Sequence, residues 1–156
     1  MNSEKLSLNK YIAVIAILLV LVMTVLDVTL VNVALPVMAE KFRVSDSNAV
    51  WIITIYQLTI TMLLLPLSSV GDLFSYRRNF LIGVVVFTIA SALCAASESF
   101  TMVLFSRTLQ GIGAACVMSV NIALTRLIYP LHILGRGLAL NAMVIAIATA
   151  AGPTIA

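Results

Sequence analysis

The stretch YIAVIAILLVLVMTVLDVTLVNVA, residues 11–34, decides the fold class of this chain. It is almost entirely apolar and contains one charged side chain, Asp27. A helix needs about 20 apolar residues to cross the roughly 30 Å of hydrocarbon in a bilayer, and this stretch is long enough. A secretory signal has a shorter apolar core and a cleavage site of small residues, and this stretch fits neither feature. We therefore interpret residues 11–34 as an uncleaved membrane span.

Four further apolar blocks follow, at approximately residues 49–70, 80–96, 100–122 and 138–156. Each is close to the length of a membrane helix, and none shows the alternation of apolar and polar residues that is typical of barrel strands. We expect Pro36, Gly71 and Gly135 to end or interrupt the apolar blocks, because proline and glycine are weak helix formers.

The composition of the whole chain supports the same interpretation. Hydrophobic residues make up 62% of the sequence and charged residues only 10%, against about 25% charged residues in a soluble domain. A very apolar soluble helical bundle is the alternative, but it does not account for repeated apolar blocks of this length. The sequence thus predicts an all-α integral membrane protein.

Several function classes are disfavoured by the same composition. The net charge is +3, but the basic residues are scattered between apolar blocks, so we expect no nucleic-acid partner. The sequence contains no metal-ligand cluster, phosphate-binding loop or nucleophile triad, so we expect no enzyme, no catalytic residue and no metal site.

The distribution of lysine and arginine predicts the orientation in the membrane. With the N-terminus in the cytoplasm, six basic residues lie in cytoplasmic segments and two in external ones; Arg107 lies inside a span. The cytoplasmic set is Lys5, Lys10, Arg77, Arg78, Arg126 and Arg136, and the external set is Lys41 and Arg43. Because basic residues are enriched in cytoplasmic loops, this bias favours a cytoplasmic N-terminus.

The fifth block reaches the end of the sequence without a charged flank or a polar tail. An odd number of spans with such an end is what we expect of the N-terminal portion of a longer polypeptide, whose missing C-terminal part would be a partner of this one. A complete small membrane protein is the alternative.

Asp27 and Arg107 are the charged residues inside predicted spans that carry the most functional information. A charge at the bilayer centre costs about 2.5–3.5 kcal/mol on insertion scales, and such residues usually face a bundle interior or water. Each lies about seven residues from the external end of its span, so both are roughly 10 Å below the outer surface and can share one polar layer. We interpret them as a proton-coupling pair. The alternatives are a structural role for Asp27 and contact of Arg107 with external headgroups.

Other polar residues in the spans are candidates for a binding cavity. Gln110 and Gly111 lie on one helical face with Arg107. Tyr56 and Gln57 lie deeper than Trp51 in the second block, where they either line a cavity or pack against neighbouring helices.

At this point the sequence resembles a known family. Residues 26–36, LDVTLVNVALP, resemble the first-helix motif of the drug:proton antiporters with fourteen spans, within the major facilitator superfamily. Residues 107–115, RTLQGIGAA, resemble the proton-coupling motif of its fourth helix. The loop GDLFSYRR, residues 71–78, is similar to the superfamily's loop motif, although Ser68, Leu73 and Ser75 depart from it.

The resemblance implies the fold and several roles. The chain would be the first five helices of a major facilitator fold of twelve or fourteen helices, a partial N-terminal half spanning residues 1–156. The residues assigned to conformational motifs are Asp72, Arg77, Arg78, Gly111, Gly152 and Pro153. Asn32, with Tyr56, Gln57 and Gln110, would face the substrate.

The implied function is proton-coupled antiport that exports drugs or toxic amphipathic compounds across the cytoplasmic (inner) membrane. Its partners would be the lipid bilayer, protons and a cationic or amphipathic small molecule, with the proton gradient in place of any cofactor. Two alternatives stay open: a small multidrug pump that works as a dimer, and a membrane remnant or partner that does not transport.

Overall fold

The computed structural model describes the backbone of residues 2–73, 75–128 and 134–155. Side-chain surroundings are described for residues 14–69, 71, 75–121, 123, 135, 137 and 139–150. Within these ranges the chain is helical and contains no strand, with the elements α1 (Asn2–Phe42), α2 (Asp46–Ala49), α3 (Trp51–Leu73), α4 (Tyr76–Ala95), α5 (Phe100–Ile128) and α6 (Leu134–Ile155). The predicted all-α class is confirmed.

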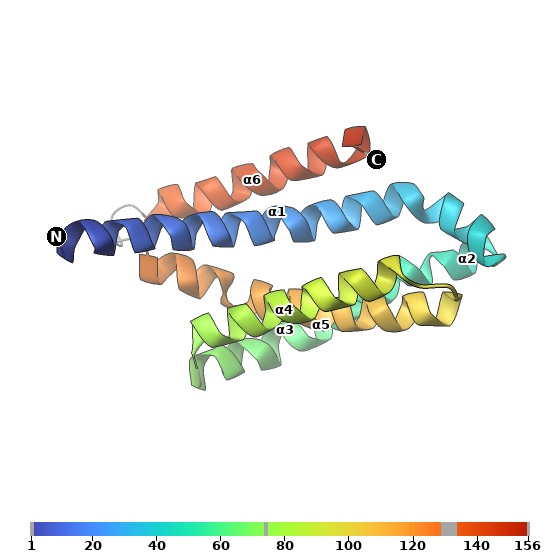
Figure 1. Ribbon diagram of the computed structural model, residues 1–156, viewed down its shortest axis with the longest axis horizontal. Coiled ribbons are helices and arrows are strands. Elements are labelled where there is room, and N and C mark those ends of the chain that lie inside the picture. Colours follow the sequence, from blue (N-terminus) through green and yellow to red (C-terminus); the bar gives the residue numbers. More distant parts are fainter. Residues whose placement is uncertain (1, 74, 129–133, 156) are drawn as a thin grey trace.

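Four helices are long and apolar enough to cross a membrane, namely Val14–Phe42, Asp46–Ser69, Tyr76–Ala95 and Phe100–Asn121. They correspond to the first four predicted blocks. In α6 the apolar part within the described residues is the shorter stretch Ala139–Ala150. Successive long helices run in opposite directions (Figure 1).

The helices extend beyond the apolar blocks. α1 begins at Asn2 rather than near residue 11, and α5 continues to Ile128 rather than ending near residue 122. Hydrophobicity marks the part of a helix that lies in hydrocarbon, and the hydrogen-bonded backbone continues into the polar zone on either side. The boundary predictions were therefore too short at these ends.

Pro36 does not end a helix, so that prediction was wrong, whereas Gly71 lies two residues before the end of α3 and Gly135 one residue after the start of α6. Pro36 lies inside α1, where it removes only the bond that its amide would donate to the carbonyl of residue 32. Membrane helices tolerate this because nearby groups compensate. α1 ends instead at Phe42, because the next residue, Arg43, has a φ of 53°, and the amide of Val44 donates to the carbonyl of Ala39 at 3.1 Å.

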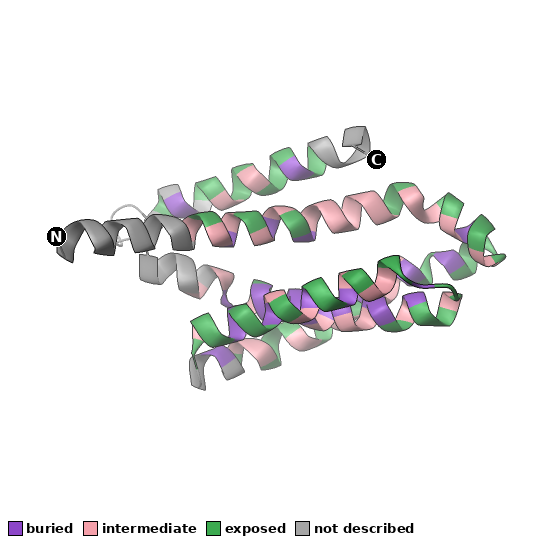
Figure 2. Ribbon diagram, in the orientation of Figure 1, coloured by how far each residue is buried: buried purple, intermediate pink, exposed green. Residues whose placement is uncertain are grey.

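The helices form two packed groups. α5 packs most extensively on α3 and α4, whereas α1 packs most extensively on α6 (Figure 1). Burial is concentrated in α5, where buried residues make up 61% of the most apolar stretch, against 17% in α1 (Figure 2). α5 is therefore the central helix, and α1 meets it along the seam between the groups.

Two glycines allow α5 to approach its neighbours closely. A Cβ at Gly113 would lie 2.5 Å from the amide nitrogen of Phe87 and 2.8 Å from the carbonyl oxygen of Gly83, both on α4. A Cβ at Gly111 would lie 3.0 Å from the carbonyl oxygen of Tyr56 on α3. The obstructing atoms are backbone atoms, which cannot rotate away as a flexible side chain can. α3, α4 and α5 are thus fixed at short separations.

Asn79 adds a polar tie within this group. Its buried side chain donates from Nδ2 to the carbonyl of Leu67 on α3 at 3.2 Å and to the hydroxyl of Ser119 on α5 at 3.5 Å. One amide therefore links all three helices near the end that is predicted to face the cytoplasm. Such interhelical bonds contribute about 0.6 kcal/mol each on average.

We predict that Gly113→Ala lowers the thermal stability of the protein, because the added methyl group must push the α4 and α5 backbones apart. Overpacking of this kind costs about 1–3 kcal/mol. Gly135→Ala is the matched control, since a Cβ there meets nothing within 4 Å and alanine is the better helix former. Melting of the detergent-purified variants, followed by size-exclusion chromatography, checks this. Equal melting temperatures for the two variants would contradict the close approach.

Candidate functional site

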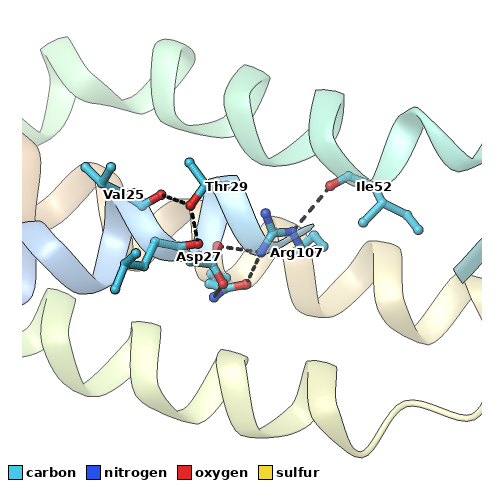
Figure 3. Close-up of polar contacts among 7 residues, drawn as sticks. Val25, Asp27, Thr29, Ile52 and Arg107 are labelled. Carbon is cyan, nitrogen blue, oxygen red and sulfur yellow. Dashed lines mark hydrogen bonds and ion pairs between the residues drawn. The ribbon is translucent and has the colours of Figure 1, made fainter. Parts of the chain in front are cut away.

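The structure brings Asp27 of α1 and Arg107 of α5 into direct contact. Arg107 Nη1 lies 2.7 Å from Asp27 Oδ2 (Figure 3). The Arg107 side chain is 1% exposed and that of Asp27 17% exposed, so the ion pair lies in the interior of the bundle. Its position follows from the helix packing, since α1 and α5 meet at the seam between the two groups.

Gln110 completes a closed triangle with the two charged residues. It lies one turn after Arg107 on α5, and its Oε1 accepts a hydrogen bond from Arg107 Nη1 at 2.7 Å. Its Nε2 donates to Asp27 Oδ1 at 2.8 Å. Both carboxylate oxygens of Asp27 therefore accept a hydrogen bond from α5. A buried ion pair needs such additional bonds to offset the cost of removing its charges from water.

α3 also contacts the guanidinium group. Arg107 Nε donates to the carbonyl oxygen of Ile52 at 3.3 Å, as Figure 3 shows. Arg107 Cζ lies 4.4 Å from the centroid of the Tyr56 ring, within the range of a cation–π interaction. Ile52 and Tyr56 are one helical turn apart on α3, and both are buried.

The hydrogen-bond inventory of Arg107 is incomplete at one nitrogen. Nε and Nη1 have partners, whereas Nη2 is buried and has none. Thr29, two residues after Asp27, does not bond to this nitrogen, because its hydroxyl donates to the carbonyls of Val25 and Leu26 on its own helix. The positive charge is thus held by one carboxylate, one amide, one carbonyl and one aromatic ring.

The arrangement has a direct chemical consequence. Two opposite charges stabilise one another across the α1–α5 contact only while Asp27 is ionised. A proton on the carboxylate would remove the ion pair and leave Arg107 charged, since a guanidinium is not deprotonated in proteins. Protonation of Asp27 would thus remove the charge that joins α1 to α5.

The structure places the remaining candidates in three ways. Asn32 and Gln57 are exposed and are not part of the buried cluster. Arg77 and Arg78 are exposed in the first turn of α4 and, with Ser75 and Leu81, line a surface pocket of about 340 Å³. The side chains of Asp72, Gly152 and Pro153 lie outside the described residues.

The contact of Arg107 with the Ile52 carbonyl could not be predicted from the sequence, because a backbone group leaves no sequence signal. The interhelical bonds of Asn79 lie outside the charged site, and an amide at the edge of an apolar block is the sequence signal for them. No group of three or more metal-ligating side chains occurs in the part of the chain that the structure describes.

The chain is similar in sequence to a family of membrane transporters. A sequence profile described as Major Facilitator Superfamily matches residues 17–156. The uncharacterized transporter YebQ of Escherichia coli (strain K12) is 44% identical over 95% of this chain and 32% of its own length.

Two further relatives differ in what their names state. The riboflavin transporter RibZ of Clostridioides difficile (strain 630) is 30% identical over 94% of this chain and 32% of its own length. The multidrug resistance protein Stp of Mycobacterium tuberculosis (strain CDC 1551 / Oshkosh) is 32% identical over 94% of this chain and 28% of its own length. The chain thus spans about a third of the length of the curated relatives it matches.

We predict that Arg107→Gln destabilises the protein more than the double variant Asp27→Asn/Arg107→Gln. The single change leaves a carboxylate in the interior without its cation, and breaking a buried pair in this way costs about 3–5 kcal/mol. The double change removes both charges and recovers part of that loss. The measurement is a double-mutant cycle. It compares the melting temperatures of the wild type, both single variants and the double variant. Additive effects would show that the two residues are not coupled.

Proposed function

Because the chain belongs to the Major Facilitator Superfamily, we propose that it is the N-terminal part of a proton-coupled antiporter that exports drugs or toxic amphipathic compounds. The membrane would be the cytoplasmic membrane, in keeping with the bacterial source of the relatives. The superfamily and the apolar helices establish a multi-pass membrane protein; the coupling ion, the substrate class and the direction of transport are our proposals.

One observation carries the proposal, namely the closed network of Asp27, Arg107 and Gln110 at the α1–α5 seam. A carboxylate and a guanidinium inside the bilayer are costly, and they are kept where they serve a substrate or proton pathway. The described residues of the spans contain no other ion pair. The network is therefore the part of the described chain best suited to bind and release a proton.

In the proposed mechanism, Asp27 exchanges a proton for substrate. While Asp27 is ionised, Arg107 and Gln110 hold α1 against α5. Protonation removes the charge that Arg107 binds and weakens this contact, which allows α1 to move relative to the α3–α5 group. Alternating access in this superfamily comes from one half rocking against the other, and a movement of α1 at the seam would reach the substrate pathway.

The names of the relatives point to two substrate classes. A relative named as a multidrug resistance protein favours export of drugs, whereas a relative named as a riboflavin transporter favours a vitamin. The exposed Asn32 and Gln57 would offer polar contacts, and apolar neighbours would suit a cationic or amphipathic molecule. Buried Tyr56 and Gln110 contact Arg107 and serve the charge site instead.

We predict that Asp27→Asn abolishes drug-linked proton movement by the full-length protein that contains this chain. Everted membrane vesicles that carry the full-length protein are energised, and a cationic drug is then added while the internal pH is followed with a fluorescent dye. The wild type should release protons on addition of drug, and Asp27→Asn should not, because an amide cannot exchange a proton.

Glu40→Gln is the matched control, since Glu40 is an exposed carboxylate on the same helix. It should retain the drug response of the wild type to within about twofold, because changes at exposed sites have small effects. An undiminished response in Asp27→Asn would refute the assigned proton site. A proton response to riboflavin but not to cationic drugs would refute the substrate class while leaving the proton site intact.

A further inference from the structure

We propose that Tyr56 is a positioning residue that holds the Arg107 guanidinium on α3 when Asp27 carries a proton. The proposal rests on the proposed function, because it concerns the state in which Asp27 is neutral. It adds that protonation of Asp27 would release α1 while Arg107 stays bound to α3.

The contacts of Arg107 with other helices fall into two sets, in addition to its bond to Gln110 on its own helix. Asp27, on α1, supplies the negative charge. The Tyr56 ring and the Ile52 carbonyl, both on α3, supply an electron-rich face at 4.4 Å and an acceptor at 3.3 Å. Only the first set changes when Asp27 takes up a proton. The second set is chemically the same in both states.

The α3 contacts matter most when Asp27 is neutral. Arg107 is 1% exposed, so water does not solvate its charge, and its Nη2 already lacks a partner. Loss of the carboxylate charge leaves the Tyr56 ring, the Ile52 carbonyl and Gln110 as the compensating groups. A cation over a desolvated aromatic face is stabilised well beyond the value for an exposed pair, and Tyr56 is 2% exposed.

The backbone of α3 and α5 fixes this contact. Gly111 lies one residue after Gln110, and a Cβ there would lie 2.8 Å from Cβ of Thr59 and 3.0 Å from the carbonyl oxygen of Tyr56. The two helices are therefore in backbone contact beside the cation–π pair. α1 packs far less extensively on α5 than α3 and α4 do, so we propose that α1 is the helix that moves.

The titratable groups around the site come from each helix that packs there. They are Asp27 on α1, Tyr56 on α3, Cys94 on α4 and Arg107 on α5, and electrostatic interactions link Tyr56 and Cys94 to both charged residues. The described part of α6 that packs along α1, residues 139–150, contains no titratable side chain. Of these four groups, Asp27 is the one carboxylate, and Arg107 is its partner in the ion pair.

The test measures protonation of Asp27 directly and needs no transport. The full-length protein is reconstituted in lipid vesicles without substrate, and the carbonyl stretch of protonated carboxyl groups is followed by infrared difference spectroscopy as pH is varied. The Asp27 band is identified by its absence in Asp27→Asn. Without the ring, the neutral state of Asp27 leaves Arg107 poorly compensated, so protons bind less readily. Tyr56→Leu should therefore move the midpoint of this band to lower pH, by about one unit.

Three companion variants separate the ring from packing. Tyr56→Phe keeps an electron-rich face and should leave the midpoint near that of the wild type. A fluorinated phenylalanine at position 56 keeps the shape but weakens the face, so it should shift the midpoint as Tyr56→Leu does. Phe87→Leu removes a ring from the same buried cluster without touching Arg107, and it should not shift the midpoint.

An unchanged midpoint in both Tyr56→Leu and the fluorinated variant would overturn the proposal. An equal shift in Phe87→Leu would also overturn it, since packing alone would then explain the effect. The proposed function fails by a different result, the absence of drug-linked proton movement in vesicles, and that result leaves the infrared midpoints unaffected.

Discussion

The ion pair between Asp27 and Arg107 is the interaction on which the rest of the site depends. In a chain with few charges, it joins two helices through groups that hydrocarbon tolerates poorly. Every polar contact around it reduces that cost: Gln110 bonds to both partners, and α3 contributes a carbonyl and an aromatic ring. The central, buried position of α5 encloses Arg107, whose side chain is 1% exposed.

The ion pair joins helices that differ in how closely they pack on their neighbours. α5 is held to α3 and α4 by backbone-to-backbone approaches at Gly111 and Gly113 and by the Asn79 amide. α1 packs mainly on α6 and meets α5 at the charged seam. A contact held by charge responds to a proton, whereas a contact held by close backbone packing does not. The ion pair therefore lies between the closely packed α3–α5 group and α1, which packs mainly on α6.

The positions of the helices and the common depth of the two charged residues were predictable from the sequence. Apolar runs of membrane length located the helices, and equal depth in the membrane placed Asp27 and Arg107 in one layer. Their direct contact depends on how the helices rotate about their axes, which periodicity does not determine. Pro36 misled because a proline signals a helix end in water but not in a bundle. Tyr56 packs against the Arg107 guanidinium, whereas the sequence left both packing and cavity lining open for it.

The central claim is that protonation of Asp27 loosens α1 from α5, and a distance between the two helices tests it most directly. Spin labels at the exposed positions Val37 on α1 and Phe105 on α5 of the full-length protein would report this distance by pulsed electron paramagnetic resonance across a range of pH. The account predicts a second, altered distance distribution at low pH, which Asp27→Asn adopts at every pH. One distribution that stays unchanged with pH, and is the same in Asp27→Asn, would contradict it.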